Sequence, residues 1–147
     1  MQQNLTIARH NNLKLVQRNN LINARRIRCT VPLNRGALKD AMPAFFDLLT
    51  EESNPAVRVV LGHFIFVYIH PYFDGNGRMG RFLMNLMMAA GGYPWTVVPL
   101  AERKIYMAAL ERASVEEDIG PFADFLARLV KNRLEGGSLP ALPKASQ

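Results

Sequence analysis

One short stretch of the chain, from His70 to Arg81, gathers residues whose types could bind and transfer a phosphate group. It contains Gly75 and Gly77, which allow positive φ and let a ligand approach the backbone closely. An apolar helical pattern follows directly, so free backbone amides and the positive end of a helix dipole are expected at the same place. Together these features predict an anion site, for which phosphate is the usual ligand.

Charged and polar side chains in the same stretch fit that interpretation. Arg78 and Arg81 are one helical turn apart, and a guanidinium binds phosphate oxygens in pairs. Asp74 is predicted either to hold Mg²⁺ or to form a salt bridge with one of these arginines. Asn76 offers an amide donor to a phosphate oxygen, and the alternative is a helix cap.

The histidines differ in what they could do. A histidine side chain titrates near neutral pH, so His70, just before the anion site, is a candidate proton acceptor. The alternative for His70 is a favourable interaction with a helix C-terminus. His63 lies on roughly the same face of the same predicted helix, and we interpret it as a core or supporting residue. His10 is expected to be exposed and to have no role.

Two central helices must position this stretch. Asn54 and Pro55 are a helix start signal, and the residues up to Ile69 are apolar nearly all round, as in the central helix of a bundle. A second helix is predicted from about Arg78 to Ala90, ended by two glycines. Further helices are predicted over 41–49 with Asp40 as its cap, over 100–114, and from Pro121 to a stop at 136–137. The fold class is therefore all-α, with the motif loop between two central helices.

Apolar periodicity also predicts which side chains face the core. In the helix over 41–49 they are Phe45, Phe46, Leu48 and Leu49. In the helix over 100–114 they are Ile105, Tyr106, Ala109 and Leu110. In the last helix they are Phe122, Phe125, Leu126, Leu129 and Val130.

Length and composition limit the organisation to one domain. The chain has 147 residues, of which 49% are hydrophobic, enough for a single packed core. We divide it into a polar and basic arm over 1–21, a core domain over 22–135 and a flexible tail over 136–147. An apolar alternation from Ile27 to Val31 predicts a strand or hairpin in front of the helices. The arm is interpreted as a possible remnant of a longer region.

The net charge of +6 favours acidic partners without choosing among them. Nucleic acid is not expected, because the basic arm has no aromatic residues that would stack on bases. No apolar stretch is long enough for a membrane span, and the N-terminus shows no secretory core. The single cysteine, Cys29, excludes an internal disulfide framework. The expected location is the cytoplasm.

The stretch from His70 to Arg81 resembles the motif of the Fic (Fido) family, HxFx[D/E]GNGRxxR, with Tyr72 at the phenylalanine position. The resemblance extends over about residues 22–135 and implies a Fic-type helical domain with a small β-hairpin flap. It implies a protein adenylyltransferase, which transfers AMP from Mg-ATP to a Ser, Thr or Tyr hydroxyl of a target protein. The cofactors implied are ATP, as substrate, and Mg²⁺.

The resemblance also implies a role for each residue of the motif. His70 would be the general base on the target hydroxyl, and Asp74 would ligate Mg²⁺. Gly75, Asn76 and Gly77 would form the anion hole, with Arg78 on the β- and γ-phosphates and Arg81 on the γ-phosphate. The target-docking flap would consist of Arg26, Ile27, Arg28, Cys29, Thr30 and Val31, which would take up the target main chain as an added strand.

Many members of that family restrain themselves with a glutamate in the pattern [S/T]xxxE[G/N]. The nearest match is Glu135 before Gly136, although Lys131 replaces the hydroxyl residue. The alternatives are an ordinary exposed glutamate, or an inhibitory element on another segment or chain. Two other functions stay open: a Fic-fold enzyme with a different phosphotransfer or de-AMPylation activity, and a non-catalytic module that binds nucleotide or nucleic acid.

Overall fold

The computed structural model describes residues 35–138, and every regular element in that range is helical. The elements are α2 (Arg35–Glu51), α3 (Pro55–Ile69), α4 (Asn76–Ala90), the 3-10 turn η1 (Leu100–Glu102), α5 (Arg103–Val115) and α6 (Gly120–Leu134). The predicted all-α fold is confirmed for this part of the chain. The arm over 1–21, the flap residues 26–31 and the tail residues 139–147 lie outside the described residues.

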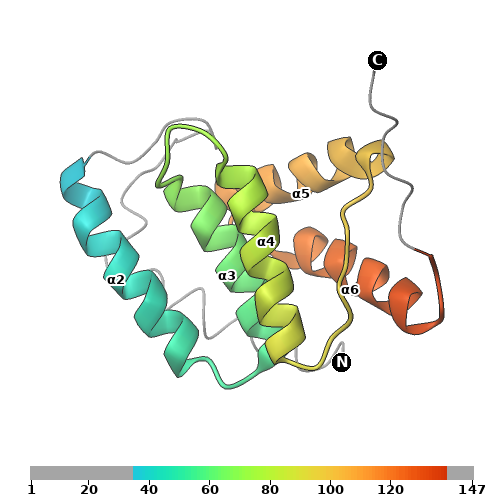
Figure 1. Ribbon diagram of the computed structural model, residues 1–147. Coiled ribbons are helices and arrows are strands. Elements are labelled where there is room, and N and C mark those ends of the chain that lie inside the picture. Colours follow the sequence, from blue (N-terminus) through green and yellow to red (C-terminus); the bar gives the residue numbers. More distant parts are fainter. Residues whose placement is uncertain (1–34, 139–147) are drawn as a thin grey trace, which may run out of the picture.

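Helix α3 is the centre of the bundle. Figure 1 shows α3 and α4 side by side, with α2 on one flank and with α5 and α6 on the other. One face of α3 packs against α2 through Val57, Leu61 and Ile65. Its other face enters a larger cluster with α4, α5 and α6, which includes Val59 and Val60. The nearly all-apolar sequence of α3 follows from this position, because a helix packed on several sides needs no polar face.

The start of α3 is set by its own sequence. The side-chain oxygen of Asn54 accepts hydrogen bonds from the amides of Ala56 and Val57, at 3.0 and 3.4 Å. Pro55 occupies the first helical position, where its missing N–H costs nothing. The predicted start is therefore confirmed, and so is the end at Ile69.

Helix α2 begins six residues earlier than predicted. It starts at Arg35, so Asp40 lies inside the helix and is not its cap, and Pro43 lies in the helix interior. Proline there removes one backbone hydrogen bond, which is why the sequence favoured a later start. Burial of Ala41 and Phe45 against α3 offsets that loss and carries the helix across the proline.

Two residues predicted to face the core are exposed. Phe46 is 55% exposed and Ile105 is 57% exposed, so both predictions were wrong. In each case a directly neighbouring residue in the sequence faces inward instead: Phe45 is 1% exposed and Tyr106 is 4% exposed. Adjacent apolar residues are about 100° apart on a helix, so only one of each pair reaches a narrow interface. All five residues predicted to be buried in α6 are buried.

The helices α3 and α4 approach each other closely because small residues lie between them. A Cβ on Gly62 would be 2.7 Å from the Met87 sulfur, and a Cβ on Gly80 would be 2.8 Å from Val67 Cγ2. The segment after α4 is held down by Asn85, which exchanges hydrogen bonds with the main chain of Thr96. Within residues 35–138, no helix has the length and apolar character needed to cross a membrane.

Candidate functional site

The candidate site is the junction between α3 and α4. Helix α3 ends at Ile69, and its C-cap is His70, whose backbone is left-handed (φ 53°, ψ 56°) and whose N–H bonds to Phe66 O at 3.2 Å. Pro71 follows and prevents the helix from continuing. Gly75 precedes α4 in a second left-handed conformation, with φ 83°. A side chain at that φ would be strained, so the glycine is required by the turn.

The first backbone amides of α4 are left open by the helix. The first amide to reach back four residues is that of Met79, which bonds to Gly75 O at 2.9 Å. The amides of Asn76, Gly77 and Arg78 precede it and have no partner within the helix. They lie at the positive end of the helix dipole, where an anion is stabilised.

The side chain of Asn76 holds the loop closed. It is 2% exposed and makes two bonds to one residue across the loop. Its Oδ1 accepts from the Tyr72 N–H at 2.9 Å, and its Nδ2 donates to Tyr72 O at 2.6 Å. The sequence had assigned this amide to a phosphate oxygen or a cap, and the structure instead gives it to the loop backbone. Gly75 is the cap residue, so Asn76 offers a ligand its backbone N–H.

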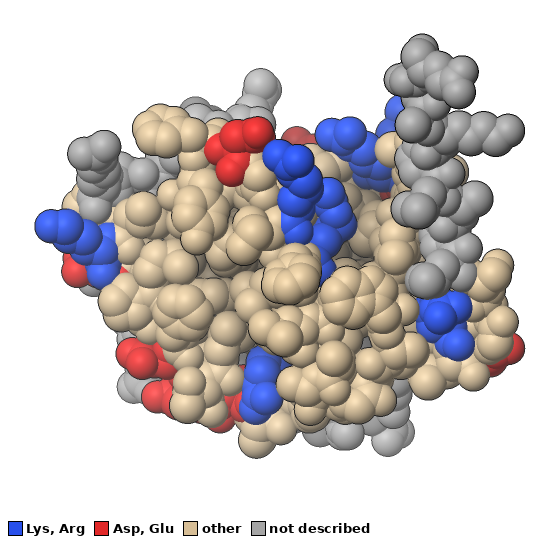
Figure 2. Space-filling model, viewed as in Figure 1, with Lys and Arg blue, Asp and Glu red and all other residues tan. Residues whose placement is uncertain are grey.

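Both arginines of the motif lie over the loop glycines. Nη2 of Arg78 is 3.9 Å from the position that a Cβ of Gly75 would take, and Nη1 of Arg81 is 3.4 Å from that of Gly77. Figure 2 shows basic and acidic side chains side by side over this junction. The two guanidinium groups therefore gather at the same end of α4 as the open amides.

Asp74 stands at the outer edge of the same site. Its Oδ2 is 3.5 Å from Arg78 Nη2, and the two side chains are 94% and 77% exposed. The salt-bridge interpretation from the sequence is thus confirmed for Arg78. An exposed pair of this length is weak, so the carboxylate remains open to a cation that brings its own phosphate and water ligands. The residues present therefore fit Mg²⁺, although no group of three metal-ligating side chains occurs among the described residues.

The open amides of Asn76, Gly77 and Arg78 and the guanidinium groups of Arg78 and Arg81 are here called the phosphate cradle. His70 is half-buried and precedes the loop that leads into this cradle. Its Nδ1 is 3.4 Å from Val67 O. A carbonyl oxygen can only accept, so this contact assigns the proton to Nδ1 and leaves Nε2 with a free lone pair. An imidazole in that state can accept a proton at Nε2.

His63 lies beneath the cradle and is fully buried. Nδ1 is 2.8 Å from Gly80 O on α4, and Nε2 is 2.7 Å from the Tyr106 hydroxyl on α5. The pKa of His63 is lowered to about 4, chiefly by burial; the bond to Gly80 opposes this shift, and the charge of Arg81 adds to it. The prediction of a core or supporting residue is confirmed. The sequence pattern predicts Tyr106 only as an apolar core residue and does not predict that its hydroxyl bonds to His63. A buried histidine requires such a polar partner.

Glu135 lies elsewhere. It caps the C-terminus of α6, is exposed, and has its carboxylate 3.8 Å from Lys131 Nζ. Figure 1 shows that end of α6 far from the junction of α3 and α4. Within the described residues, the structure does not bring Glu135 together with Arg81.

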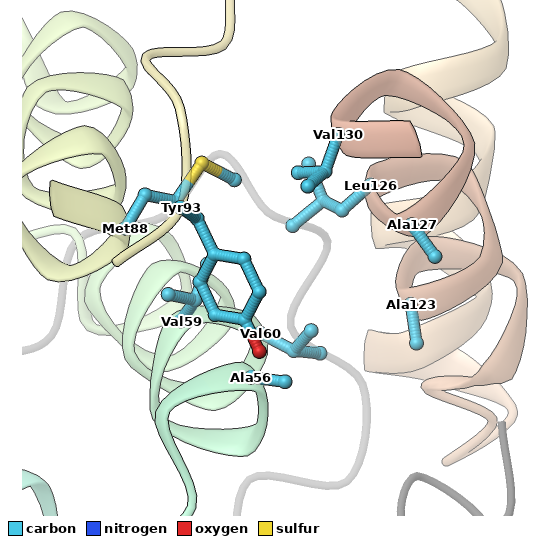
Figure 3. A pocket seen from close by; sticks show the side chains of 9 residues that line it. All are labelled: Ala56, Val59, Val60, Met88, Tyr93, Ala123, Leu126, Ala127 and Val130. Carbon is cyan, nitrogen blue, oxygen red and sulfur yellow. The ribbon is translucent and has the colours of Figure 1, made fainter. Parts of the chain in front are cut away.

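A small apolar pocket is also distinct from the junction. Figure 3 shows it between the first turns of α3, the end of α4 and helix α6, with Val60, Tyr93 and Leu126 among its lining side chains. No charged residue lines it. It therefore lacks the donors that a phosphate group requires.

Comparisons with known proteins agree with the motif. Residues 4–88 match the model of the Fic/DOC family. The chain is 38% identical over 109 residues to "Protein adenylyltransferase Fic" of Drosophila willistoni, which is 71% of this chain and 22% of that protein. The protein of the same name from Drosophila grimshawi gives the same identity and coverage. This chain thus spans about a fifth of the length of these curated relatives.

Solved structures share the fold. Fic-1 from C. elegans matches with a TM-score of 0.64 and 27% identity, over 88% of this chain and 40% of that one. A Fic-domain signalling protein from Bacteroides thetaiotaomicron matches with a TM-score of 0.63 over 92% of this chain and 74% of that one. Its identity of 19% supports the fold alone.

Proposed function

Because the chain belongs to the Fic/DOC family, we propose that it transfers AMP from Mg-ATP to a Ser, Thr or Tyr hydroxyl of a target protein. The observation that carries the proposal is the junction of α3 and α4, where two guanidinium groups and the open amides of one helix end surround a single place. A polyphosphate neutralises that concentration of positive charge. Relatives named protein adenylyltransferase support the choice of reaction.

The binding step assigns a role to each part of the cradle. The amides of Asn76, Gly77 and Arg78, which follow the left-handed turn at Gly75, receive the phosphate oxygens. The forked side chain of Arg78 holds the β- and γ-phosphates, and that of Arg81 holds the γ-phosphate. Asp74 would hold Mg²⁺, which supplies charge neutralisation on the phosphates when it is bound. Fixing the triphosphate in this way exposes the α-phosphorus for attack in line with the leaving group.

The chemical step forms one bond and breaks one. The target hydroxyl oxygen attacks the α-phosphorus, and the bond from that phosphorus to the bridging oxygen of the β-phosphate breaks. Pyrophosphate leaves, and the hydroxyl proton passes to Nε2 of His70, which the contact of Nδ1 with Val67 O leaves unprotonated. The products are an AMP-modified target and pyrophosphate, and the enzyme keeps no covalent bond.

The target partner is the other half of the proposal. We propose that residues 26–31 dock the target main chain as an added strand, which the alternating side chains of Ile27 to Val31 support. Restraint by Glu135 would have to act on a second chain, because its own helix end lies far from the junction. The reaction consumes Mg-ATP, and we assign it to the cytoplasm.

Mass spectrometry of intact proteins tests the reaction. The purified chain, Mg-ATP and candidate target proteins should yield a target heavier by one AMP, and the His70→Ala variant should yield none while still binding Mg-ATP. A Lys131→Ala variant, changed at the remote end of α6, is the matched control and should keep the activity. ATP labelled at the α- or γ-phosphate separates AMP transfer from phosphate transfer. Label that reaches the target only from the γ-phosphate would refute the proposal.

A further inference from the structure

His63 joins four helices at one point below the phosphate cradle. Its ring belongs to α3, bonds to the main chain of α4 at Gly80 O and to α5 at the Tyr106 hydroxyl, and stacks on Phe122 of α6. The ring centroids of His63 and Phe122 are 5.3 Å apart at an interplanar angle of 24°. The proposed reaction assigns no step to this side chain.

The hydrogen bonds define one state of the ring. Gly80 O can only accept, so Nδ1 carries the proton and donates it at 2.8 Å. Nε2 of a neutral ring is then an acceptor, and the Tyr106 hydroxyl donates to it at 2.7 Å. Burial lowers the pKa of His63 to about 4, so the ring stays neutral at cellular pH. Both ring nitrogens are therefore satisfied in a single arrangement.

Gly80, whose carbonyl oxygen accepts the bond from His63, lies near the start of α4. Gly80 stands between Arg78 and Arg81, in the turn that follows the open amides. A Cβ on Gly80 would be 3.3 Å from His63 Cε1, so the ring is packed directly against this turn. Since His63 and His70 lie on the same helix, one hydrogen bond connects the helix that carries His70 to the turn that carries the arginines.

We propose that His63 is a positioning residue: the bond from Nδ1 to Gly80 O fixes the first turns of α4, and hence the phosphate cradle, relative to the end of α3 and His70. This inference rests on the proposed function. An apolar side chain of similar size would fill the same space, so packing alone does not require a donor here. What the donor adds is a fixed register between two helices that meet at the cradle.

The test separates the two ring nitrogens. In a His63→Asn variant the side-chain amide can take the place of Nδ1 and donate to Gly80 O. In a His63→Gln variant the longer side chain takes its amide towards the place of Nε2, near Tyr106, and the bond to Gly80 is lost. Two measurements are made on the full chain: the Kd for Mg-ATP by calorimetry, and hydrogen exchange of the backbone amides over 79–84.

The positioning role predicts unequal effects. His63→Gln should weaken Mg-ATP binding about tenfold, which is about 1.4 kcal/mol, and should speed exchange over 79–84. His63→Asn should stay within about threefold of the wild type in both measurements. Tyr106→Phe, which keeps the bond to Gly80, should also stay within about threefold. Leu129→Ala, in the buried core on α6, should lower the Tm without changing the Kd.

Some outcomes would overturn the inference. It fails if His63→Asn and His63→Gln behave alike, because the ring would then act only by filling space. It also fails if His63→Gln leaves both the Kd and the exchange rates unchanged. A wild-type chain that does not bind Mg-ATP would refute the proposed function instead. In that case exchange over 79–84 in the two variants still decides whether His63 fixes this turn.

Discussion

Gly80 on α4 and Val67 on α3 are in such close contact that a Cβ on the glycine would lie 2.8 Å from Val67 Cγ2. Both residues belong to the junction that carries the candidate site, because Val67 O contacts His70 and Gly80 O bonds to His63. The spacing of the two helices at the site thus depends on the absence of one methyl group. This contact gives the first prediction.

Gly80→Ala should destabilise the protein by up to about 2 kcal/mol. Overpacking of a tight contact costs about 1–3 kcal/mol, whereas alanine gains at most about 1 kcal/mol over glycine in a helix. Urea denaturation measures the difference. A Gly80→Ala, Val67→Ala double variant restores the space and should lose less than the sum of the two single variants. Strict additivity of the two losses would show that the methyl group meets no obstacle at Val67.

The buried imidazole predicts how stability depends on pH. The pKa of His63 is about 4 in the folded chain against 6.5 for an ordinary histidine, because burial disfavours the charged ring. Between these values the unfolded chain binds a proton that the folded chain excludes. His63 therefore contributes stability that is complete above about pH 6.5 and is lost as the pH falls towards 4, by about 3 kcal/mol in total.

Denaturation of the wild type and of His63→Asn from pH 4.5 to 7.5 measures this contribution. The carboxylates titrate alike in both proteins, so the difference between the two curves isolates the ring. The wild-type free energy of unfolding should fall more steeply with acid than that of the variant. Parallel curves would mean that the ring is already charged in the folded protein or is reached by water.

Signals that lie close together in the sequence predicted their structure well. The start of α3 is marked by the adjacent residues Asn54 and Pro55, and its end by Pro71, so the local sequence is enough to place both. The motif residues also gather as expected, because a tight turn between two helices leaves a short segment few arrangements. Asp74 and Arg78, for example, are four residues apart and form the predicted ion pair.

Features that depend on distant parts of the chain were missed. The extension of α2 back through Pro43 rests on packing of Ala41 against α3, which no local pattern reports. The partners of His63 come from α4 and α5, so the sequence indicated a core histidine without its hydrogen bonds. Asn76 was misjudged for the same reason, since its side chain turns back to Tyr72 and not outward.

Asn76→Ala should loosen the loop before α4. The change removes the side-chain partner of the Tyr72 N–H and C=O, and because both bonds are part-buried the loss should be about 0.5–1.5 kcal/mol for each bond. It should also weaken Mg-ATP binding about tenfold, because the amides of the cradle belong to the same loop. Asn76→Asp should bind Mg-ATP more weakly still, since it loses the donor and adds a negative charge beside the phosphates.

Asn85→Ala is the matched control for that prediction. Asn85, further along α4, is nearly as buried, at 4% exposed, and exchanges similar reciprocal bonds with the main chain of Thr96, in the segment after α4. It should lose comparable stability in denaturation and keep the Mg-ATP affinity of its folded form. Equal losses of affinity in both variants would indicate general loosening of α4 and no special role for the loop clamp.

Asp74 predicts how the reaction depends on magnesium. Its carboxylate is 94% exposed and pairs only loosely with Arg78, at 3.5 Å, so Asp74→Asn should change the free energy of unfolding by less than about 1 kcal/mol. The same change should raise the Mg²⁺ concentration for half-maximal AMP transfer about tenfold or more, because the carboxylate is the side-chain ligand proposed for the ion. Titration of Mg²⁺ at saturating ATP measures this, and a chelator should abolish transfer in every variant.

Glu116→Gln, which removes another exposed carboxylate from its pair with Arg112, should keep the wild-type requirement for Mg²⁺. An unchanged requirement in Asp74→Asn would remove this residue from the metal site and leave the carboxylate only its ion pair with Arg78.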